Sequence, residues 1–122
     1  MPGIKLLTKL DAGTCLKLAW RAAQDLGFTL TPLGAEVQRF TATKGNALLG
    51  MLAGAIAPYC AFNISIECYP DANEIVLEKN NPWLTGGKIG VGKIDQQAEA
   101  LLNEITRAIE REGSAVVGRK EF

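Results

Sequence analysis

Residues 87–93 are the stretch of this chain whose residue types and spacing best suit chemistry on a charged ligand. Gly87, Gly92 and Lys93 fit the pattern G-x-x-x-x-G-K and precede a predicted helix. In phosphate-binding loops of this pattern, backbone N–H groups hold the phosphates, the Lys reaches the terminal phosphates, and a following Ser or Thr binds Mg²⁺. Ile94 stands where that hydroxyl is needed, and the residues before Gly87 are not patterned as a buried strand. The pattern therefore does not predict a P-loop nucleoside triphosphatase.

A weaker hypothesis remains for the same stretch. Residues 86–93 are expected to form a Gly-rich loop that leads into a helix, and a helix N-terminus attracts anions through its unpaired N–H groups and its dipole. On this interpretation Gly90, Gly92 and Lys93 bind an anion or the phosphates of a nucleotide. The alternative is a flexible connector. Trp83, in the same loop, either stacks on a ligand or covers the end of the core.

The titratable side chains exclude the commonest catalytic and metal sites. The chain has no His, which removes His-based acid–base catalysis, Ser-His-Asp and Cys-His sites, and most catalytic zinc sites. Its three cysteines, Cys15, Cys60 and Cys68, lack the C-x-x-C spacing of a metal knuckle and are too few for a disulfide framework. We expect Cys60 and Cys68 to pack as small apolar residues, and Cys15 to lie where a helix start favours a thiolate. We therefore expect no enzyme, no catalytic residue, no metal and no cofactor.

The most unusual feature is an uncharged run between Lys44 and Glu67. Of its 22 residues, 15 are apolar and three are Gly. Residues 46–57 are expected to form a helix that ends at Pro58. Gly50 and Gly54 would lie on a narrow face of small residues, and the bulky side chains roughly opposite belong to Leu49, Leu52 and Ile56. Two glycines in a helix cost about 2 kcal/mol relative to Ala, so a close approach of another backbone is the expected gain.

Three interpretations of segment 46–57 compete. A membrane span needs about 20 apolar helical residues, and too few precede Pro58, so membrane association is the weakest. An ordinary buried helix or loop packed on a sheet is the second. The third, which we favour, is a segment whose other face is covered by a second copy of the chain or by an apolar ligand, because it is apolar all round. Leu49, Gly50, Leu52, Gly54 and Ile56 are then the contact residues.

Length and charge set the wider limits. The 122 residues suit one domain, and Lys plus Arg equals Asp plus Glu at 13 each, so the formal net charge is zero. A nucleic-acid-binding domain usually has a basic excess, so no nucleic-acid partner is expected. Lys5 and Lys9 interrupt the N-terminus too early for a signal peptide, which favours the cytoplasm.

Hydrophobic spacing predicts the elements that position these residues. A first strand is expected over 4–8, an amphipathic helix from about Asp11 to Gly27, two hairpins over 28–43 and 60–79, and a long helix from Ile94 to Glu112. The order is β-α-β-β-(apolar insert)-β-β-α. It indicates an α+β sandwich, with an antiparallel sheet of four to five strands covered on one face by helices. Residues 1–113 are assigned to one domain and 114–122 to a flexible C-terminal tail.

The sequence thus favours a small cytoplasmic binding or assembly domain. Segment 46–57 would mediate homo-oligomer formation or hold an apolar ligand. The first alternative is an anion- or nucleotide-binding domain that uses residues 86–93, and the weaker one is peripheral association with a membrane.

Overall fold

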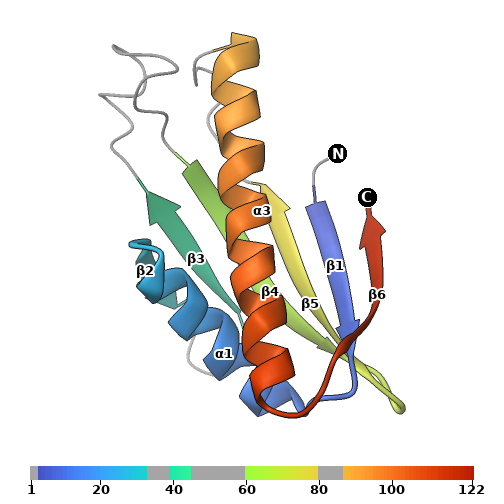
Figure 1. The fold of residues 1–122 in the computed structure, drawn as a ribbon. Coiled ribbons are helices and arrows are strands. Elements are labelled where there is room, and N and C mark those ends of the chain that lie inside the picture. The colour runs from blue at the N-terminus through green and yellow to red at the C-terminus, as the bar shows by residue number, and fades with distance from the viewer. Residues whose placement is uncertain (1–2, 33–38, 45–59, 80–86) are drawn as a thin grey trace.

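The structure is a computed structural model, and it describes residues 3–32, 39–44, 60–79 and 87–122. These residues form two helices and a six-stranded sheet (Figure 1). In chain order the elements are β1 (Gly3–Thr8), α1 (Ala12–Asp25), β2 (Thr29–Pro32), β3 (Arg39–Lys44), β4 (Cys60–Cys68), β5 (Asn73–Lys79), α3 (Gly87–Arg111) and β6 (Val116–Glu121).

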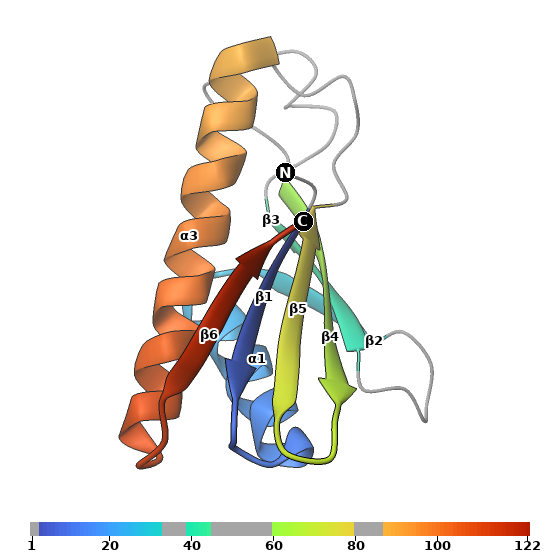
Figure 2. The ribbon, with the colours of Figure 1, turned by 90° about the vertical axis from the view of Figure 1, so that its right-hand side faces the viewer.

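The sheet is antiparallel throughout, with strand order β2-β3-β4-β5-β1-β6. Both helices lie on one face of it, as Figure 2 shows from the side. The predicted α+β class is therefore confirmed, with six strands instead of four to five. The predicted hairpins are present as β2–β3 and β4–β5.

The local signals for α1 act as expected. The Asp11 side chain accepts a hydrogen bond from the Thr14 N–H at 3.0 Å and so caps the first turn. Beyond the last turn, Gly27 has a φ of +88°, a left-handed conformation that costs glycine little. Between these ends the helix buries a stripe of small and apolar side chains against the sheet, namely Cys15, Leu18, Ala19, Ala22 and Ala23.

The core lies between the helices and the covered face of the sheet. Strand β4 alternates as predicted, with buried Cys60, Phe62, Ile64 and Ile66 on this face. Phe62 meets Phe28 with ring centres 5.8 Å apart, and α3 adds fully buried Leu101, Leu102, Ile105 and Ile109. Among the described residues, every buried side-chain nitrogen or oxygen has a hydrogen-bond partner. The described part of the chain therefore has a well-satisfied core of its own.

The expected tail, residues 114–122, is the first correction. Residues 116–121 form the edge strand β6, paired with β1 in a register that places Leu6 opposite Arg119. Val116 packs against the core, and Arg119 forms an ion pair with Glu99 of α3. Half of the residues of β6 are charged, so the strand lacks the apolar alternation that predicts a strand, and backbone pairing with β1 forms it instead.

The start of the long helix is the second correction. Residues 87–93 were expected to be a loop, but α3 begins at Gly87. Each Gly in a helix costs only about 1 kcal/mol relative to Ala, and a helix already formed extends at little further cost. The amphipathic part of α3 after Ile94 therefore extends toward the N-terminus through the glycine-rich turns.

The two ends of the sheet differ in how the chain leaves them. At one end, called here the turn end, short connections follow Thr8 and Cys68 and precede Asn73 and Val116. At the other, called the open end, the chain leaves β3 at Lys44 and β5 at Lys79 and enters β4 at Cys60. The first turns of α3 extend past the open end (Figure 1).

Candidate binding site at the open end of the sheet

The register of the sheet brings the flanks of both sequence-predicted sites together. Lys44 lies opposite Cys60 across β3 and β4, and Phe62 lies opposite Lys79 across β4 and β5. The residues that precede and follow segment 45–59 are therefore neighbours, and β5 leaves the sheet toward residues 80–86 one strand away. The open end is thus the place where the two candidate segments join the described fold.

Most of the predicted contact residues lie outside the described residues. This applies to Leu49, Gly50, Leu52, Gly54 and Ile56 of the apolar segment and to Trp83.

Gly90, Gly92 and Lys93 lie within α3 and not in a loop. In an α-helix only the N–H groups of the first turn lack intrahelical partners, and Gly92 and Lys93 are the sixth and seventh residues of α3. Gly92 is exposed, and a Cβ added to it would meet nothing within 4 Å. The prediction of a Gly-rich loop is wrong for residues 87–93, because these residues are helical. Gly92 and Lys93 follow the turn that could offer backbone N–H groups to an anion.

Lys44 ties the open end together, although the sequence did not single it out. Its Nζ donates to the Leu26 carbonyl oxygen at 2.8 Å and to Gln97 Oε1 at 3.4 Å, and it lies 5.2 Å from the centre of the Phe28 ring. One side chain of β3 thereby links the end of α1 to α3. Burial raises the pKa of the neighbouring Cys60 thiol, and the Lys44 charge partly opposes that shift.

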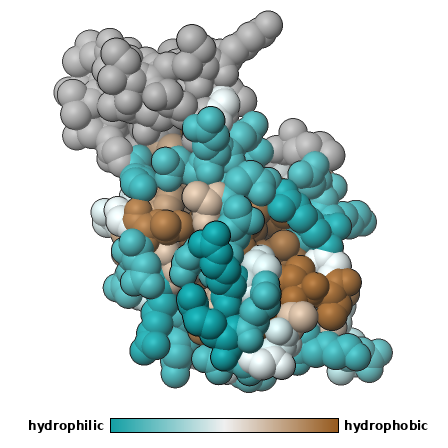
Figure 3. All heavy atoms as spheres, viewed as in Figure 1, coloured by the Kyte–Doolittle hydropathy of each residue, from teal (hydrophilic) through white to brown (hydrophobic). Residues whose placement is uncertain are grey.

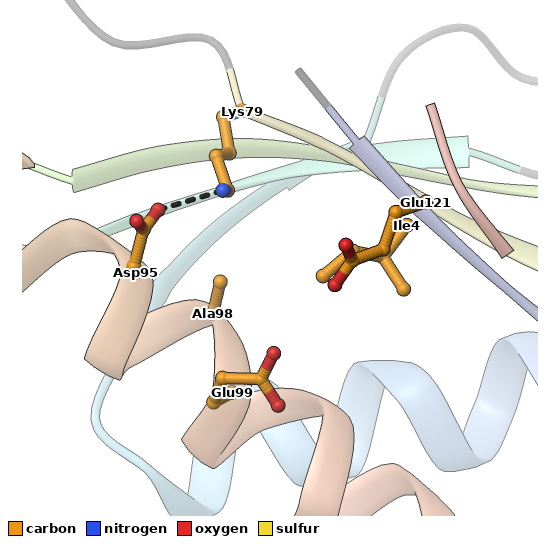
Figure 4. A pocket seen from close by; sticks show the side chains of 6 residues that line it. All are labelled: Ile4, Lys79, Asp95, Ala98, Glu99 and Glu121. Atoms are coloured by element: carbon orange, nitrogen blue, oxygen red, sulfur yellow. Dashed lines mark hydrogen bonds and ion pairs between the residues drawn. The ribbon is translucent and has the colours of Figure 1, made fainter. Parts of the chain in front are cut away.

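A small cavity lies between α3 and the open end of the sheet. Its volume is about 200 Å³, and its walls are Ile4, Lys79, Asp95, Ala98, Glu99 and Glu121. Figure 4 shows Lys79 reaching from β5 to the Asp95 carboxylate, 2.6 Å away, with Glu99 and Glu121 on the two remaining sides. The floor is apolar, formed by Ile4 and Ala98. The charged groups come from α3, β5 and β6, so only the tertiary fold assembles this cavity.

The second ion pair at this cavity joins Glu99 of α3 to Arg119 of β6. Arg119 donates through Nη1 to Glu99 Oε2 at 3.2 Å and also contacts Glu121 at 3.4 Å. These hydrogen bonds from the guanidinium hold the pKa of Glu99 below its usual value, and the same pair raises the pKa of Arg119. Both pairs are partly exposed, and exposed pairs contribute at most about 1 kcal/mol each. Their main effect is to fix α3 relative to the sheet edge.

The carboxylates at this cavity are paired with cations of neighbouring elements. Among the described residues, no group of three or more Cys, Asp or Glu is arranged to hold a metal ion. The carboxylates of Asp95 and Glu99 are engaged by Lys79 and Arg119. The arrangement braces the helix over the sheet and leaves the apolar segment as the main candidate for binding.

Two further hollows lie away from the open end. One of about 190 Å³ lies on the helix-free sheet face beside Arg39, and one of about 230 Å³ lies between α1 and α3 beside Arg21 and Arg111. The helix-bearing face is mainly hydrophilic, with small hydrophobic patches, as Figure 3 shows. Among the described residues, the large hydrophobic side chains that are exposed belong to Tyr69 and Val117.

Comparisons with known proteins identify no family for this chain. No protein family model matches the chain, and a search of curated proteins finds none with significant sequence similarity. No helix within the described ranges is long and apolar enough to cross a lipid bilayer.

Proposed function

We propose that this protein is a small non-enzymatic binding or assembly domain that acts through the open end of its sheet. Segment 46–57 would contact a second copy of the chain or an apolar ligand, with Leu49, Leu52 and Ile56 supplying apolar area. Gly50 and Gly54 would permit close approach of the partner. The domain would act in the cytoplasm as a homo-oligomer.

The observation that carries this proposal is the register at the open end. Lys44 and Cys60 lie opposite each other, so the uncharged run is attached to the described fold at adjacent strands. Both flanks are anchored, because Cys60 is 1% exposed and Lys44 is bonded to α1 and α3. A long connection on a rigid scaffold is where binding residues are commonly found.

The described core gives a second line of support. The large apolar side chains of the described residues form one buried cluster between the helices and the sheet. An additional apolar segment beside such a core commonly marks a partner or ligand surface.

The anion-binding alternative has less support. Gly92 and Lys93 lie beyond the first turn of α3, so their backbone N–H groups are not among those that lack an intrahelical partner. Peripheral membrane association through segment 46–57 also remains a proposal, and flotation with liposomes tests it directly.

The native mass in solution tests the main proposal. Light scattering on a size-exclusion column, over a range of protein concentrations, should show a dimer or larger oligomer. Gly54→Leu should lower the mass to that of the monomer, because the added side chain blocks close approach, while circular dichroism and the midpoint of thermal unfolding stay unchanged.

Gly13→Leu is the matched control for that substitution. Gly13 is an exposed residue in the first turn of α1, at the turn end, and an added Cβ would have Asp11 Oδ2 at 3.5 Å as its nearest neighbour. This variant should keep the wild-type mass. A wild-type monomer that carries no co-purified apolar molecule in native mass spectrometry would contradict the proposal.

A further inference from the structure

The three cysteines occupy different environments in the fold. Cys60 and Cys68 are the first and last residues of β4, and both lie on the helix side of the sheet by strand alternation. Cys15 lies in α1 and is fully buried, and Cys60 is 1% exposed. Cys68 is exposed. One accessible thiol and one buried thiol therefore lie at the turn end, where α1 begins, and Cys60 lies at the open end.

The carbonyl oxygen of Leu10 brings Cys15 and Cys68 into the same neighbourhood. It accepts hydrogen bonds from Cys15 Sγ at 3.5 Å and from Asn73 Nδ2 at 2.9 Å. Asn73 is the residue directly opposite Cys68 across β4 and β5. Side chains of directly opposite residues are about 5 Å apart at Cβ. Cys15 of α1 and Asn73 of the sheet thus meet at the same carbonyl, and Cys68 is the cross-strand neighbour of Asn73.

Electrostatics agree with this closeness. Burial, and to a smaller extent the nearby Asp11 carboxylate and the Cys68 sulfur, raise the pKa of Cys15 to about 11. The helix start does not produce the stabilised thiolate that the sequence suggested for Cys15. Instead, Cys15 is a shielded thiol beside an accessible one.

We propose that Cys68 is a site of oxidation by peroxides and that Cys15 resolves it by forming an intramolecular Cys15–Cys68 disulfide. The inference is independent of the function proposed for the open end. The reversible bond would tie the first turn of α1 to the end of β4.

The chemistry proceeds in two balanced steps. The Cys68 thiolate attacks one oxygen of a hydroperoxide, the O–O bond breaks, and Cys68 sulfenic acid forms while the peroxide is reduced to an alcohol or water. The Cys15 thiolate then attacks the Cys68 sulfur, the S–S bond forms, the S–O bond breaks, and the oxygen leaves as water. Because Cys15 is rarely ionised near neutral pH, the rate of the second step should rise about tenfold per pH unit between pH 7 and 9.

Mass spectrometry of the intact wild-type protein tests the proposal. The reduced protein is treated with hydrogen peroxide, the remaining thiols are alkylated, and the protein is digested without reductant. The expected result is a loss of two hydrogen atoms, one alkylated cysteine, and a linked peptide pair that contains Cys15 and Cys68. Dithiothreitol should restore three alkylated cysteines.

Two variants separate the roles of the thiols. Cys60→Ala should form the same linked pair, because Cys60 lies at the opposite end of β4. Cys15→Ala, checked for folding by circular dichroism, should stop at a Cys68 sulfenic acid that a dimedone probe labels. The proposal is overturned if the folded wild-type protein gives only overoxidised Cys68, disulfides between two chains, or a linked pair that contains Cys60.

Discussion

The turn end and the open end of the sheet are built in different ways. At the turn end the connections within the described residues are short and hydrogen-bonded: the Tyr69 N–H donates to the Ala72 carbonyl oxygen at 2.9 Å, and Gly113 closes α3 with a φ of +82°. Asp11 caps α1 at the same end. At the open end, β3 and β4 are joined through residues 45–59, and β5 and α3 through residues 80–86.

This difference separates what holds the fold from what is free to bind. Local capping and tight turns specify the turn end, whereas ion pairs and buried side chains from several elements brace the open end. Long connections on a braced scaffold tolerate sequence change and often carry function. The core and the tight turns therefore stabilise the fold, and the open end is where the proposed binding role would lie.

The largest expected effect on stability comes from truncating a core side chain near the open end of the sheet. Phe62 is fully buried and contacts the Phe28 ring, so Phe62→Ala should lower the free energy of unfolding by about 3–5 kcal/mol. Urea denaturation followed by circular dichroism measures the change.

Ile75→Ala is the counterpart nearer the turn end. Ile75 is also fully buried and lies opposite Leu6 and Ile66, so a loss of about 2–5 kcal/mol is expected there too. A loss below about 1 kcal/mol for Phe62→Ala alone would mean that the core does not support the open end as described.

Gly113→Ala probes the turn end through its backbone. An L-residue in the left-handed region costs about 1–2 kcal/mol, and no neighbouring atom interferes with an added Cβ, so the whole loss reports the φ of +82°. Gly118→Ala is the control, because its Cβ would make an ordinary contact of 3.5 Å with Leu7 Cβ. The control should stay within about 0.5 kcal/mol of wild type, and equal losses in both variants would contradict the assignment.

Gly92→Ala should raise the free energy of unfolding, in contrast to Gly113→Ala, and it tests the helical start of α3 at the open end. If Gly92 lies within α3 in open space, Ala should stabilise the protein by about 0.5–1 kcal/mol through helix propensity. If residues 87–93 instead formed an anion-binding loop, the variant would lose stability and any stabilisation by millimolar phosphate. Thermal unfolding with and without phosphate distinguishes the two results.

The sequence predicted the elements whose signals are local. The hairpin over 60–79 and the amphipathic helix that begins at about Asp11 both appear in the structure. Strand β6 was missed because half of its residues are charged and its pairing partner, β1, lies more than 100 residues earlier in the chain. The start of α3 was missed because residues 87–93 contain three glycines, which are typical of a loop, whereas an established helix extends through them at little cost.

The cavity at the open end was missed for a related reason. Lys79 and Asp95 meet across a strand and a helix, and Glu99 and Arg119 meet across a helix and a different strand. No local pattern marks such pairs, because each depends on where the sheet order places β5 and β6 relative to α3. By contrast, the apolar segment was identified at once, because an uncharged run is a property of composition.

The smallest predicted effect concerns the ionisation of Tyr69 at the turn end. Its hydroxyl donates to Glu67 Oε2 at 2.9 Å, and hydrogen bonds and charges from Glu67 and then Glu74 raise the pKa of Tyr69 to about 12. The raised pKa means that the folded state favours the neutral phenol. The stabilisation is therefore complete below the unfolded pKa of about 10 and is lost as the pH rises through about 12.

Ultraviolet titration of tyrosinate should show this late ionisation, and Tyr69→Phe should remove it. Glu67→Gln should lower the midpoint more than Glu74→Gln, because Glu67 makes the larger contribution, and the reverse order would show that the hairpin holds its two carboxylates differently from the geometry described.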